Sequence, residues 1–453
     1  MTGGQLQRKL GLFPATNIVV ANMIGAGIFT TSGLLMAGLN NPLLMLALWV
    51  IGGVIALCGA LSYGELGAAM PGAGGEYHFL SRLYHPLFGF LSGWVSFVVG
   101  FSAPIAASAL GFSEYFCRAL PAIPNWFESA GIMDQAASRT FLSLSVILIF
   151  TFIHYRGIKT GTVIQNILTL LKVALIVFLL LAGFLSGKGD ISHFSAGDGV
   201  SSGLAGWKTI GLSLMWIMFA YSGWNASTYL GAEIKNPSKI LPRSLILGTG
   251  IVMLIYLGLN VLYVYGINPE EMKGVISVGG LVMGNLFGKS ADTLFSLLIA
   301  FALFSSLSAF IIIGPRVYYS MAKDGLFFKS VSQIHPKFQV PSNSIILQGT
   351  IAIVLALSGT FEQVLTYMGF ALGIFPILTV IGVFKLRKDN PNALRIAGFP
   401  FAQIIYVTTG ILILFLAFLE RPIESSIASL TVIAGIPAYY IFKRTNGNKS
   451  DLS

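Results

Sequence analysis

The sequence predicts an all-α integral membrane protein that forms a single transmembrane domain over residues 1–453. Of its residues, 55% are hydrophobic and only 10% are charged, whereas a soluble domain carries about 25% charged residues. The apolar residues also form long continuous blocks, and a helix needs roughly 20 of them to cross a bilayer. Only helices and closed barrels satisfy their backbone groups in lipid, and these blocks are too long for barrel strands. The composition excludes a soluble enzyme and a disordered chain.

The blocks predict twelve membrane-spanning helices, of which the fourth and the ninth are short. Five lie within residues 11–185, five within residues 207–385, and two within residues 400–442. In chain order the predicted spans cover residues 11–38, 43–69, 86–116, 140–155, 162–185, 207–232, 242–266, 291–321, 343–358, 363–385, 400–419 and 423–442.

Lysines and arginines in the connecting loops predict the orientation. The chain has 27 Lys and Arg against 17 Asp and Glu, a formal net charge of +10. Most of these bases lie in loops on the same side as the N-terminus, which the positive-inside rule makes the cytoplasmic side. An even number of spans then places both termini in the cytoplasm, with the protein in the plasma membrane. The basic balance is therefore explained by topology, and no nucleic-acid partner is expected.

Two predicted spans carry glycine-interrupted or polar segments at mid-membrane. Gly25 and Gly27 lie within residues 22–29 of span one, and a polar run covers residues 219–228 of span six. A glycine costs about 1 kcal/mol relative to alanine in a helix interior, and the span-one segment alone is compatible with tight helix packing. Together, at corresponding positions of two five-helix halves, they indicate the central site of a transporter.

A broken helix exposes backbone groups suited to a particular class of ligand. The N-terminus of a half-helix has free N–H groups and partial positive charge, so it attracts a carboxylate. The C-terminus of a half-helix has free carbonyls and attracts an ammonium group. A site that offers both is suited to a zwitterionic α-amino acid.

Two ionisable residues within the predicted spans stand out by their position. Lys172 lies in the middle of span five, where a charge costs from about 3 kcal/mol to more than 10 kcal/mol. It either ties the helix bundle to backbone carbonyls or acts in coupling, as a fixed cation or as a proton carrier. Glu65 lies near the cytoplasmic end of span two, and we expect it to pair with a loop cation at that face.

Four blocks of motifs carry a resemblance to a known family. They are Gly25–Phe29; Tyr63–Gly67 with Gly74–Tyr77 and Gly93-Trp94; Phe219–Asn225 with Glu233–Pro237 and Leu241–Arg243; and Arg316–Gly325 with His335-Pro336. In order and spacing they resemble the amino acid–polyamine–organocation superfamily over about residues 8–390. The aromatic-Ala-Tyr-x-Gly-Trp-Asn run and the lysine of span five resemble the L-type amino acid transporter family within it.

This resemblance implies a fold and a set of site residues. The fold is a five-plus-five inverted repeat with discontinuous spans one and six and two additional C-terminal helices. The substrate carboxylate would meet the backbone amides of Gly25, Ala26 and Gly27, and its amino group the carbonyls of Ile24, Phe219, Ala220 and Ser222. Phe219 would be the gating aromatic, and Asn225 a polar group of the pocket wall. Lys172 would replace the sodium ion of relatives, touching the break of span one and Ser305, Ser306 or Ser308.

The expected function is sodium-independent secondary transport of neutral L-amino acids by alternating access, as an exchanger. Neutral substrates are favoured because the predicted pocket has no side-chain charge apart from Lys172. Proton-coupled symport stays open, and the alternative of a different class is a membrane nutrient sensor or channel on the same fold. An enzyme is not expected, since the sequence has no acid/base or metal-ligand constellation.

Neither a cofactor nor a metal is expected, and the expected partners are the amino acid substrate and the lipid bilayer. Animal members of the resembled family pair with a single-span glycoprotein through an external cysteine in the loop after span three. Here Cys117 lies at the end of that span, earlier than this position. A heavy-chain glycoprotein partner is therefore not expected.

Overall fold

The computed structural model describes residues 8, 10–72, 74–156, 158–195, 197–338, 340–359, 361–392 and 394–447, with side chains omitted for 158–166, 446 and 447. Every regular element within these residues is helical, and the only extended pairing among them is an isolated bridge between Leu10 and Ile234. The prediction of an all-helical protein is confirmed for this part of the chain.

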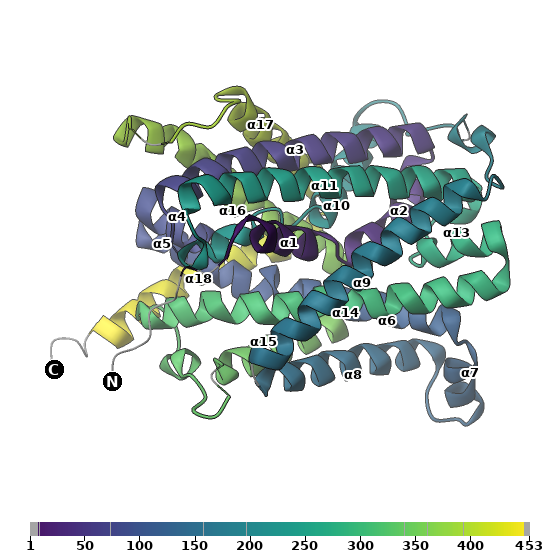
Figure 1. The fold of residues 1–453 in the computed structure, drawn as a ribbon, viewed down its shortest axis with the longest axis horizontal. Helices are drawn as coiled ribbons and strands as arrows, with labels where there is room; N and C mark the ends of the chain where they lie inside the picture. The colour runs from purple at the N-terminus through teal and green to yellow at the C-terminus, as the bar shows by residue number, and fades with distance from the viewer. Residues whose placement is uncertain are drawn as a thin grey trace.

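In the part of the chain that the structure describes, eighteen α-helices follow one another, with short 3₁₀ and π turns between some of them. Figure 1 shows their arrangement. Their bounds are α1 Leu12–Met23, α2 Ala26–Leu39, α3 Pro42–Ala69, α4 Glu76–Leu83, α5 Pro86–Val95, α6 Ser102–Ala119, α7 Ala122–Ser129, α8 Gln135–Tyr155, α9 Ile158–Leu185, α10 Leu204–Ala220, α11 Pro237–Gly266, α12 Pro269–Met272, α13 Val278–Phe287, α14 Lys289–Lys323, α15 Ser342–Ser358, α16 Phe361–Asp389, α17 Phe401–Glu420 and α18 Pro422–Gly447.

Ten helical stretches among the described residues are long and apolar enough to cross a membrane, counting α1 with α2 and α5 with α6. They correspond to ten of the twelve predicted spans. The sixth and ninth predicted spans correspond to α10 and α15, which have 17 residues each. The fourth span is longer than predicted, because the Asp134 side chain accepts a hydrogen bond from the Ala137 N–H at 2.7 Å and starts α8 at Gln135.

The glycine-rich segment of span one separates two helices. α1 ends at Met23 and α2 begins at Ala26, with Gly25 extended between them at φ −121° and ψ −158°. The predicted span six is interrupted more completely. α10 ends at Ala220, and only 3₁₀ turns at Ala226–Tyr229 and Gly231–Glu233 precede α11. The stretch from 221 to 232, predicted as part of an α-helical span, is therefore not α-helical.

The third span is also irregular, which the sequence analysis did not predict. A π turn, Ser96–Gly100, separates α5 from α6, and the Phe101 N–H donates to the Ser96 carbonyl at 3.0 Å. Pro104 accounts for the irregularity, because proline has no N–H to donate to the carbonyl four residues earlier and its ring clashes with it. That carbonyl belongs to Gly100, the last residue of the π turn.

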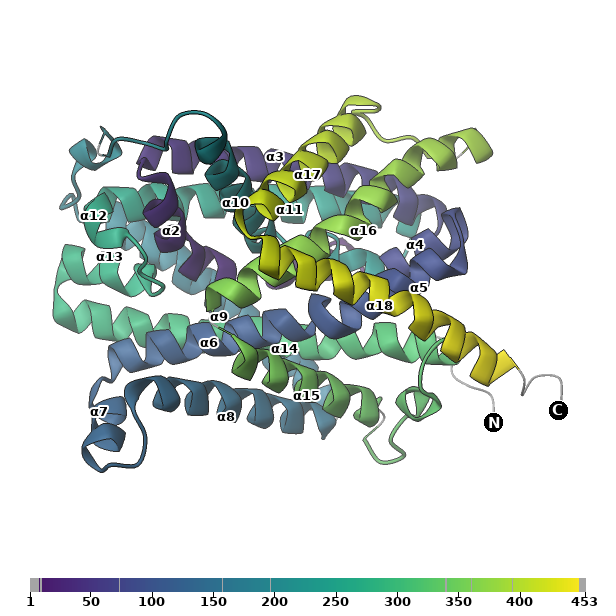
Figure 2. The ribbon, with the colours of Figure 1, turned by 180° about the vertical axis from the view of Figure 1, so that it is seen from behind.

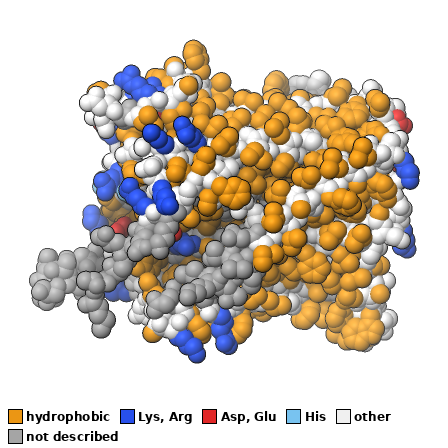
Figure 3. Space-filling model, in the orientation of Figure 1, with side chains coloured by type: hydrophobic (Ala, Val, Ile, Leu, Met, Phe, Trp, Pro, Cys, Tyr) orange, Lys and Arg blue, Asp and Glu red, His pale blue; other side chains and the backbone are white. Residues whose placement is uncertain are grey.

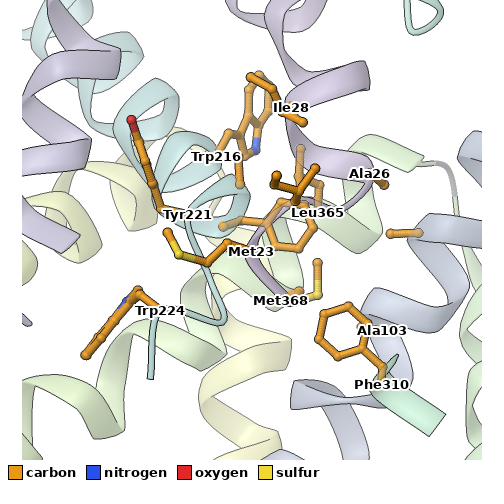
Figure 4. Close-up of a cluster of buried hydrophobic side chains, with 14 of the residues drawn as sticks. Met23, Ala26, Ile28, Ala103, Trp216, Tyr221, Trp224, Phe310, Leu365 and Met368 are labelled. Atoms are coloured by element: carbon orange, nitrogen blue, oxygen red, sulfur yellow. The ribbon is translucent and has the colours of Figure 1, made fainter. Parts of the chain in front are cut away.

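The long helices pack roughly alongside one another, with α9 crossing in front of α14 and with α16, α17 and α18 on the opposite face (Figures 1 and 2). The surface is largely apolar on the face shown in Figure 3, and most Lys and Arg side chains visible there gather at the end where α18 finishes. Around the break between α1 and α2, buried side chains of α6, α10, α14 and α16 form an apolar shell (Figure 4). The broken segments are therefore held inside the protein, away from lipid.

Candidate functional site

The two broken segments contact each other at the centre of the molecule. A Cβ added to Gly27, in the first turn of α2, would lie 2.6 Å from the Ala220 Cα at the end of α10. Gly223 follows that end with φ +94°, and a Cβ there would lie 2.9 Å from the Asn22 carbonyl carbon. A positive φ and such a close approach both require glycine. The two breaks, about 200 residues apart in sequence, thus form one site.

Backbone groups at this junction lack helical partners, as expected where helices end. The N–H groups of Ala26 and Gly27 lie in the first turn of α2, so no preceding helical carbonyl is available to them. Carbonyls at the ends of α1 and α10 are held by Tyr256 of α11. Its Oη lies 2.5 Å from the Met23 carbonyl oxygen and 3.0 Å from the Ala220 carbonyl oxygen. One phenol therefore bridges both breaks, a role that the sequence analysis missed.

Lys172 points from α9 to the end of α1, with only 1% of its surface exposed. Its Nζ donates to the Ala21 carbonyl at 3.1 Å, to the Ile24 carbonyl, and to Ser306 Oγ at 3.2 Å. Ser306 Oγ in turn donates to the Ile24 carbonyl at 2.9 Å. Within the described part of the chain, Lys172 forms no ion pair. A single ammonium group thus satisfies the free carbonyl end of the first half-helix.

The three serines expected near Lys172 have different partners. Ser306 contacts the lysine directly, whereas Ser305 Oγ lies 3.3 Å from Thr169 Oγ1. Ser308 Oγ lies 2.9 Å from the Nε2 of His154, a buried residue of α8. The polar face of α14 therefore joins α8, α9 and α1, and one of its serines reaches Lys172.

A cavity of about 110 Å³ lies beside the junction. Of the predicted site residues, Phe219, Ser222 and Asn225 line it. Its full lining is Asn22, Glu76, Ser96, Gly100, Phe101, Met218, Phe219, Ser222, Gly223, Trp224, Asn225, Ala226, Tyr229, Phe310, Ile313, Gly369, Leu372, Gly373, Pro376 and Tyr406. This volume holds several water molecules, so the cavity has room for a small polar solute.

The predicted residues Ile24, Gly25, Ala26, Gly27 and Ala220 lie at the junction but outside the cavity lining. The Ile24 carbonyl already accepts two hydrogen bonds, and Ala220 has its carbonyl oxygen beside Tyr256. Their contacts with a substrate stay a prediction. A second cavity, of about 330 Å³, shares Asn22 and Ile313 with the first and also contains Glu233 and Arg316. Asn22, near the end of α1, thus lines both cavities.

Glu76 corrects the expectation that Lys172 is the pocket's only charged side chain. It begins α4, is 7% exposed, and lines the cavity. Asn225 Nδ2 donates to its Oε1 at 2.9 Å, and Ser92 Oγ donates to its Oε2 at 3.3 Å. The Gly-Gly-Glu-Tyr run was visible in the sequence. Its carboxylate could not be placed at the cavity, because Asn225 lies 149 residues away.

The second buried acid, Glu65, is paired as expected. Arg387 Nε and Nη2 lie 2.6 Å and 2.8 Å from its two carboxylate oxygens, and the Ile396 N–H donates to Oε2 at 3.0 Å. Arg387 belongs to the last part of α16, beyond the predicted span, and its guanidinium stacks on the Phe399 ring at 3.9 Å. This bidentate pair joins α3 to α16, and the Ile396 N–H joins α3 to the segment that connects α16 and α17.

The described residues show no candidate metal centre for catalysis. They contain no group of three His, Cys, Asp or Glu side chains that could hold a metal ion. What the site offers is a cavity lined by both apolar and polar side chains, two broken helices with free backbone groups, and a buried ammonium. Paired broken helices around a central cavity in a many-helix membrane protein are typical of secondary transporters.

Comparison with known proteins identifies the family. The sequence profile of the amino acid permease family matches residues 10–437. The chain therefore belongs to the amino acid permease family. This family of multi-pass membrane transporters is part of the amino acid–polyamine–organocation superfamily, which the sequence motifs resemble. Membership in a transporter family confirms the expectation that the protein is not an enzyme.

Several curated proteins are similar to this chain over nearly its whole length. The b(0,+)-type amino acid transporter 1 of Mus musculus is 26% identical over 441 residues, 96% of this chain and 88% of that protein. The serine/threonine exchanger SteT of Bacillus subtilis is 28% identical over 448 residues, 97% of this chain and 98% of that protein. The large neutral amino acids transporter small subunit 2 of Rattus norvegicus is 26% identical over 453 residues, 97% of this chain and 81% of that protein.

Proposed function

We propose that this protein is a sodium-independent secondary transporter that exchanges neutral L-amino acids by alternating access. The observation that carries the proposal is the position of Lys172 Nζ, hydrogen-bonded to Ala21, Ile24 and Ser306 oxygens at the end of α1. In sodium-coupled transporters such free carbonyls coordinate the cation. A fixed ammonium fills this oxygen set and repels a sodium ion, so transport needs none.

Both ends of an amino acid have matching groups at the junction. The first-turn N–H groups of α2 and its helix dipole suit the carboxylate. Carbonyls near the end of α10 suit the ammonium group, among them those of Phe219 and Ser222. Phe219 is buried at the cavity wall, in a position to cover a bound substrate. Exchange is supported by the similarity to SteT, a serine/threonine exchanger, and the small side chains of Ala26 and Ser222 leave space for varied neutral substrates.

The proposal includes a fold and a topology. The two halves, residues 11–185 and 207–385, form an inverted repeat of five plus five helices, followed by two helices within residues 400–442. All twelve spans cross the plasma membrane, and both termini lie in the cytoplasm. The end of the protein where α18 finishes, at which basic side chains gather, is the cytoplasmic end (Figure 3). This arrangement is supported by the paired breaks in α1/α2 and after α10.

A heavy-chain glycoprotein is not part of the proposed assembly. Cys117 lies within α6, is a free thiol, and is 5% exposed. A disulfide to a second protein requires an accessible sulfur atom, which Cys117 does not offer.

Purified protein in lipid vesicles tests this proposal. Uptake of labelled L-serine is measured with and without unlabelled L-serine inside, in sodium buffer and in potassium buffer. We expect uptake only into preloaded vesicles, at equal rates in both buffers. Uptake that requires sodium would refute sodium independence, and uptake into empty vesicles would refute obligatory exchange. A competition panel of the twenty amino acids then gives the substrate range, and strong competition by only charged amino acids would contradict neutral specificity.

A further inference from the structure

The Glu76 carboxyl is a buried acid without a counter-ion. Both Glu65 and Glu76 are almost fully buried, with 1% and 7% of their surface exposed. Glu65 has the bidentate guanidinium of Arg387. Within the described part of the chain, no Lys, Arg or His nitrogen lies within 4.0 Å of Glu76. The difference matters because a buried carboxylate is stable only when its charge is compensated.

Within the described part of the chain, the polar groups that face Glu76 are neutral. Hydrogen bonds reach it from Asn225, in the interrupted span six, and from Ser92 of α5. The other titratable groups around it are three phenols, Tyr63 of α3, Tyr229 of the 3₁₀ turn and Tyr406 of α17. Lys172 contacts α1 and α14 instead. The carboxyl is therefore the one strongly acidic group among these facing side chains.

These surroundings favour a carboxyl that gains and loses a proton near neutral pH. Burial disfavours the charged form, while the Ser92 and Asn225 donors and the N-terminus of α4 favour it. Burial prevails and raises the pKa of Glu76 to about 7. The neutral acid thus predominates below about pH 7 and the carboxylate above it. Phenols titrate near pH 10 or higher and stay neutral throughout this range.

We propose that the Glu76 carboxyl is a proton-binding site of the transport cavity, and that its proton state controls movement of the segment after α10. The inference rests on the proposed transport function and adds a ligand to it, the proton. A proton from water binds Oε2, and the new O–H donates to Ser92 Oγ, while Asn225 Nδ2 continues to donate to Oε1. On release the proton returns to water and the carboxylate again accepts from Ser92.

The proton state changes how firmly two moving parts are joined. A hydrogen bond to a carboxylate is roughly twice as strong as one between neutral groups. Asn225 therefore ties the segment after α10 to α4 strongly when Glu76 is ionised, and weakly when it is protonated. α4 itself is anchored on the other side, since Tyr77 Oη donates to Asp324 Oδ2 at 2.5 Å. Protonation of Glu76 thus weakens the contact between α4 and the segment after α10, while the contact between α4 and Asp324 remains.

The variant Glu76→Gln imitates the protonated acid, because its amide can donate to Ser92 Oγ and accept from Asn225 Nδ2. Exchange of labelled L-serine is measured in vesicles between about pH 6 and pH 8, together with the infrared carbonyl stretch of protonated carboxylic acids. We expect the wild type to change its exchange rate with a midpoint near pH 7, and Glu76→Gln to lose both this dependence and one titrating infrared band. Asp389→Asn, at an exposed acid of α16, is the control that keeps both.

A second variant tests the direction of the effect. Ser92→Ala removes a donor to the carboxylate, so the midpoint should move to higher pH, by up to about one unit. If Glu76→Gln keeps the pH dependence and the infrared band, the proton-binding site is refuted. If no amino acid is exchanged by any form of the protein while the band still titrates, the transport proposal fails and the proton site stands.

Discussion

Truncation of Lys172 to alanine is the most informative perturbation of this site. Lys172→Ala removes two hydrogen bonds to the end of α1 and one to Ser306 of α14. The Ile24 carbonyl keeps Ser306 Oγ as a donor at 2.9 Å, whereas the Ala21 carbonyl loses the lysine. A buried carbonyl left without its donor costs about 1–3 kcal/mol. Relief of the ammonium's desolvation offsets part of this cost.

A change of about 1–3 kcal/mol corresponds to a 5- to 150-fold change in the population of the ordered end of α1. We expect this to appear in the transport rate, because Lys172 of α9 joins the end of α1 to α14 through its hydrogen bonds. Substrate affinity should change by less than about threefold, since the N–H groups of Ala26 and Gly27 do not contact Lys172. The variant therefore separates transport from binding.

The assay compares exchange of labelled L-serine in vesicles with equilibrium binding of L-serine to the purified protein. We expect Lys172→Ala to lower the saturated exchange rate at least about tenfold. Lys239→Ala, at an exposed residue of α11, is the matched control and should resemble the wild type. If Lys172→Ala exchanges L-serine at the wild-type rate, Lys172 has only a structural role. If Lys172→Ala lowers substrate binding as much as the exchange rate, the prediction that Lys172 acts on transport rather than on binding is refuted.

Three further changes probe the parts that hold the site together. Tyr256→Phe leaves the shape but removes the hydroxyl at both breaks, and should lower exchange with a stability loss of about 1–3 kcal/mol; an unchanged rate would contradict its bridging role. Gly223→Ala should destabilise by at least about 1 kcal/mol, measured by thermal unfolding in detergent against Gly131→Ala, where φ is +66° but a Cβ has open space; equal losses would show that the close approach is unimportant. Glu65→Gln should cost about 3–5 kcal/mol by leaving Arg387 unpaired, and the double variant Glu65→Gln/Arg387→Gln should recover part of it; an additive double variant would refute the coupling.

Hydropathy and glycine placement predicted the large features because they depend on short stretches of chain. The position of each apolar block is set by the thickness of the lipid, and the break between α1 and α2 by two glycines in the same turn. Asp134 shows the limit at the helix ends, since one capping side chain extended α8 five residues beyond the predicted start at 140. The π turn before α6 was missed for the same reason, as a local proline effect overrode continuous hydropathy.

For contacts between residues far apart in sequence, the sequence predicted at most the type of partner and not which residue it is. Glu65 required a cation, but the sequence offered many, and Arg387 lies 322 residues away. Tyr256 looked like one apolar residue among others in α11, although its hydroxyl lies between both breaks. Glu76 belonged to a recognisable motif, yet nothing local indicated that it lines the cavity beside Asn225.

The sequence by itself determined an all-helical membrane protein, the site of its two breaks and its one deeply placed lysine. Each of these follows from the cost of exposing polar groups to lipid, which acts on every segment separately. Only the tertiary structure decided which polar groups meet: Lys172 with the end of α1, Tyr256 with both breaks, and Glu76 with Asn225. Those contacts depend on how distant helices pack, because a buried polar group is satisfied by whichever partner the packing brings within hydrogen-bonding distance.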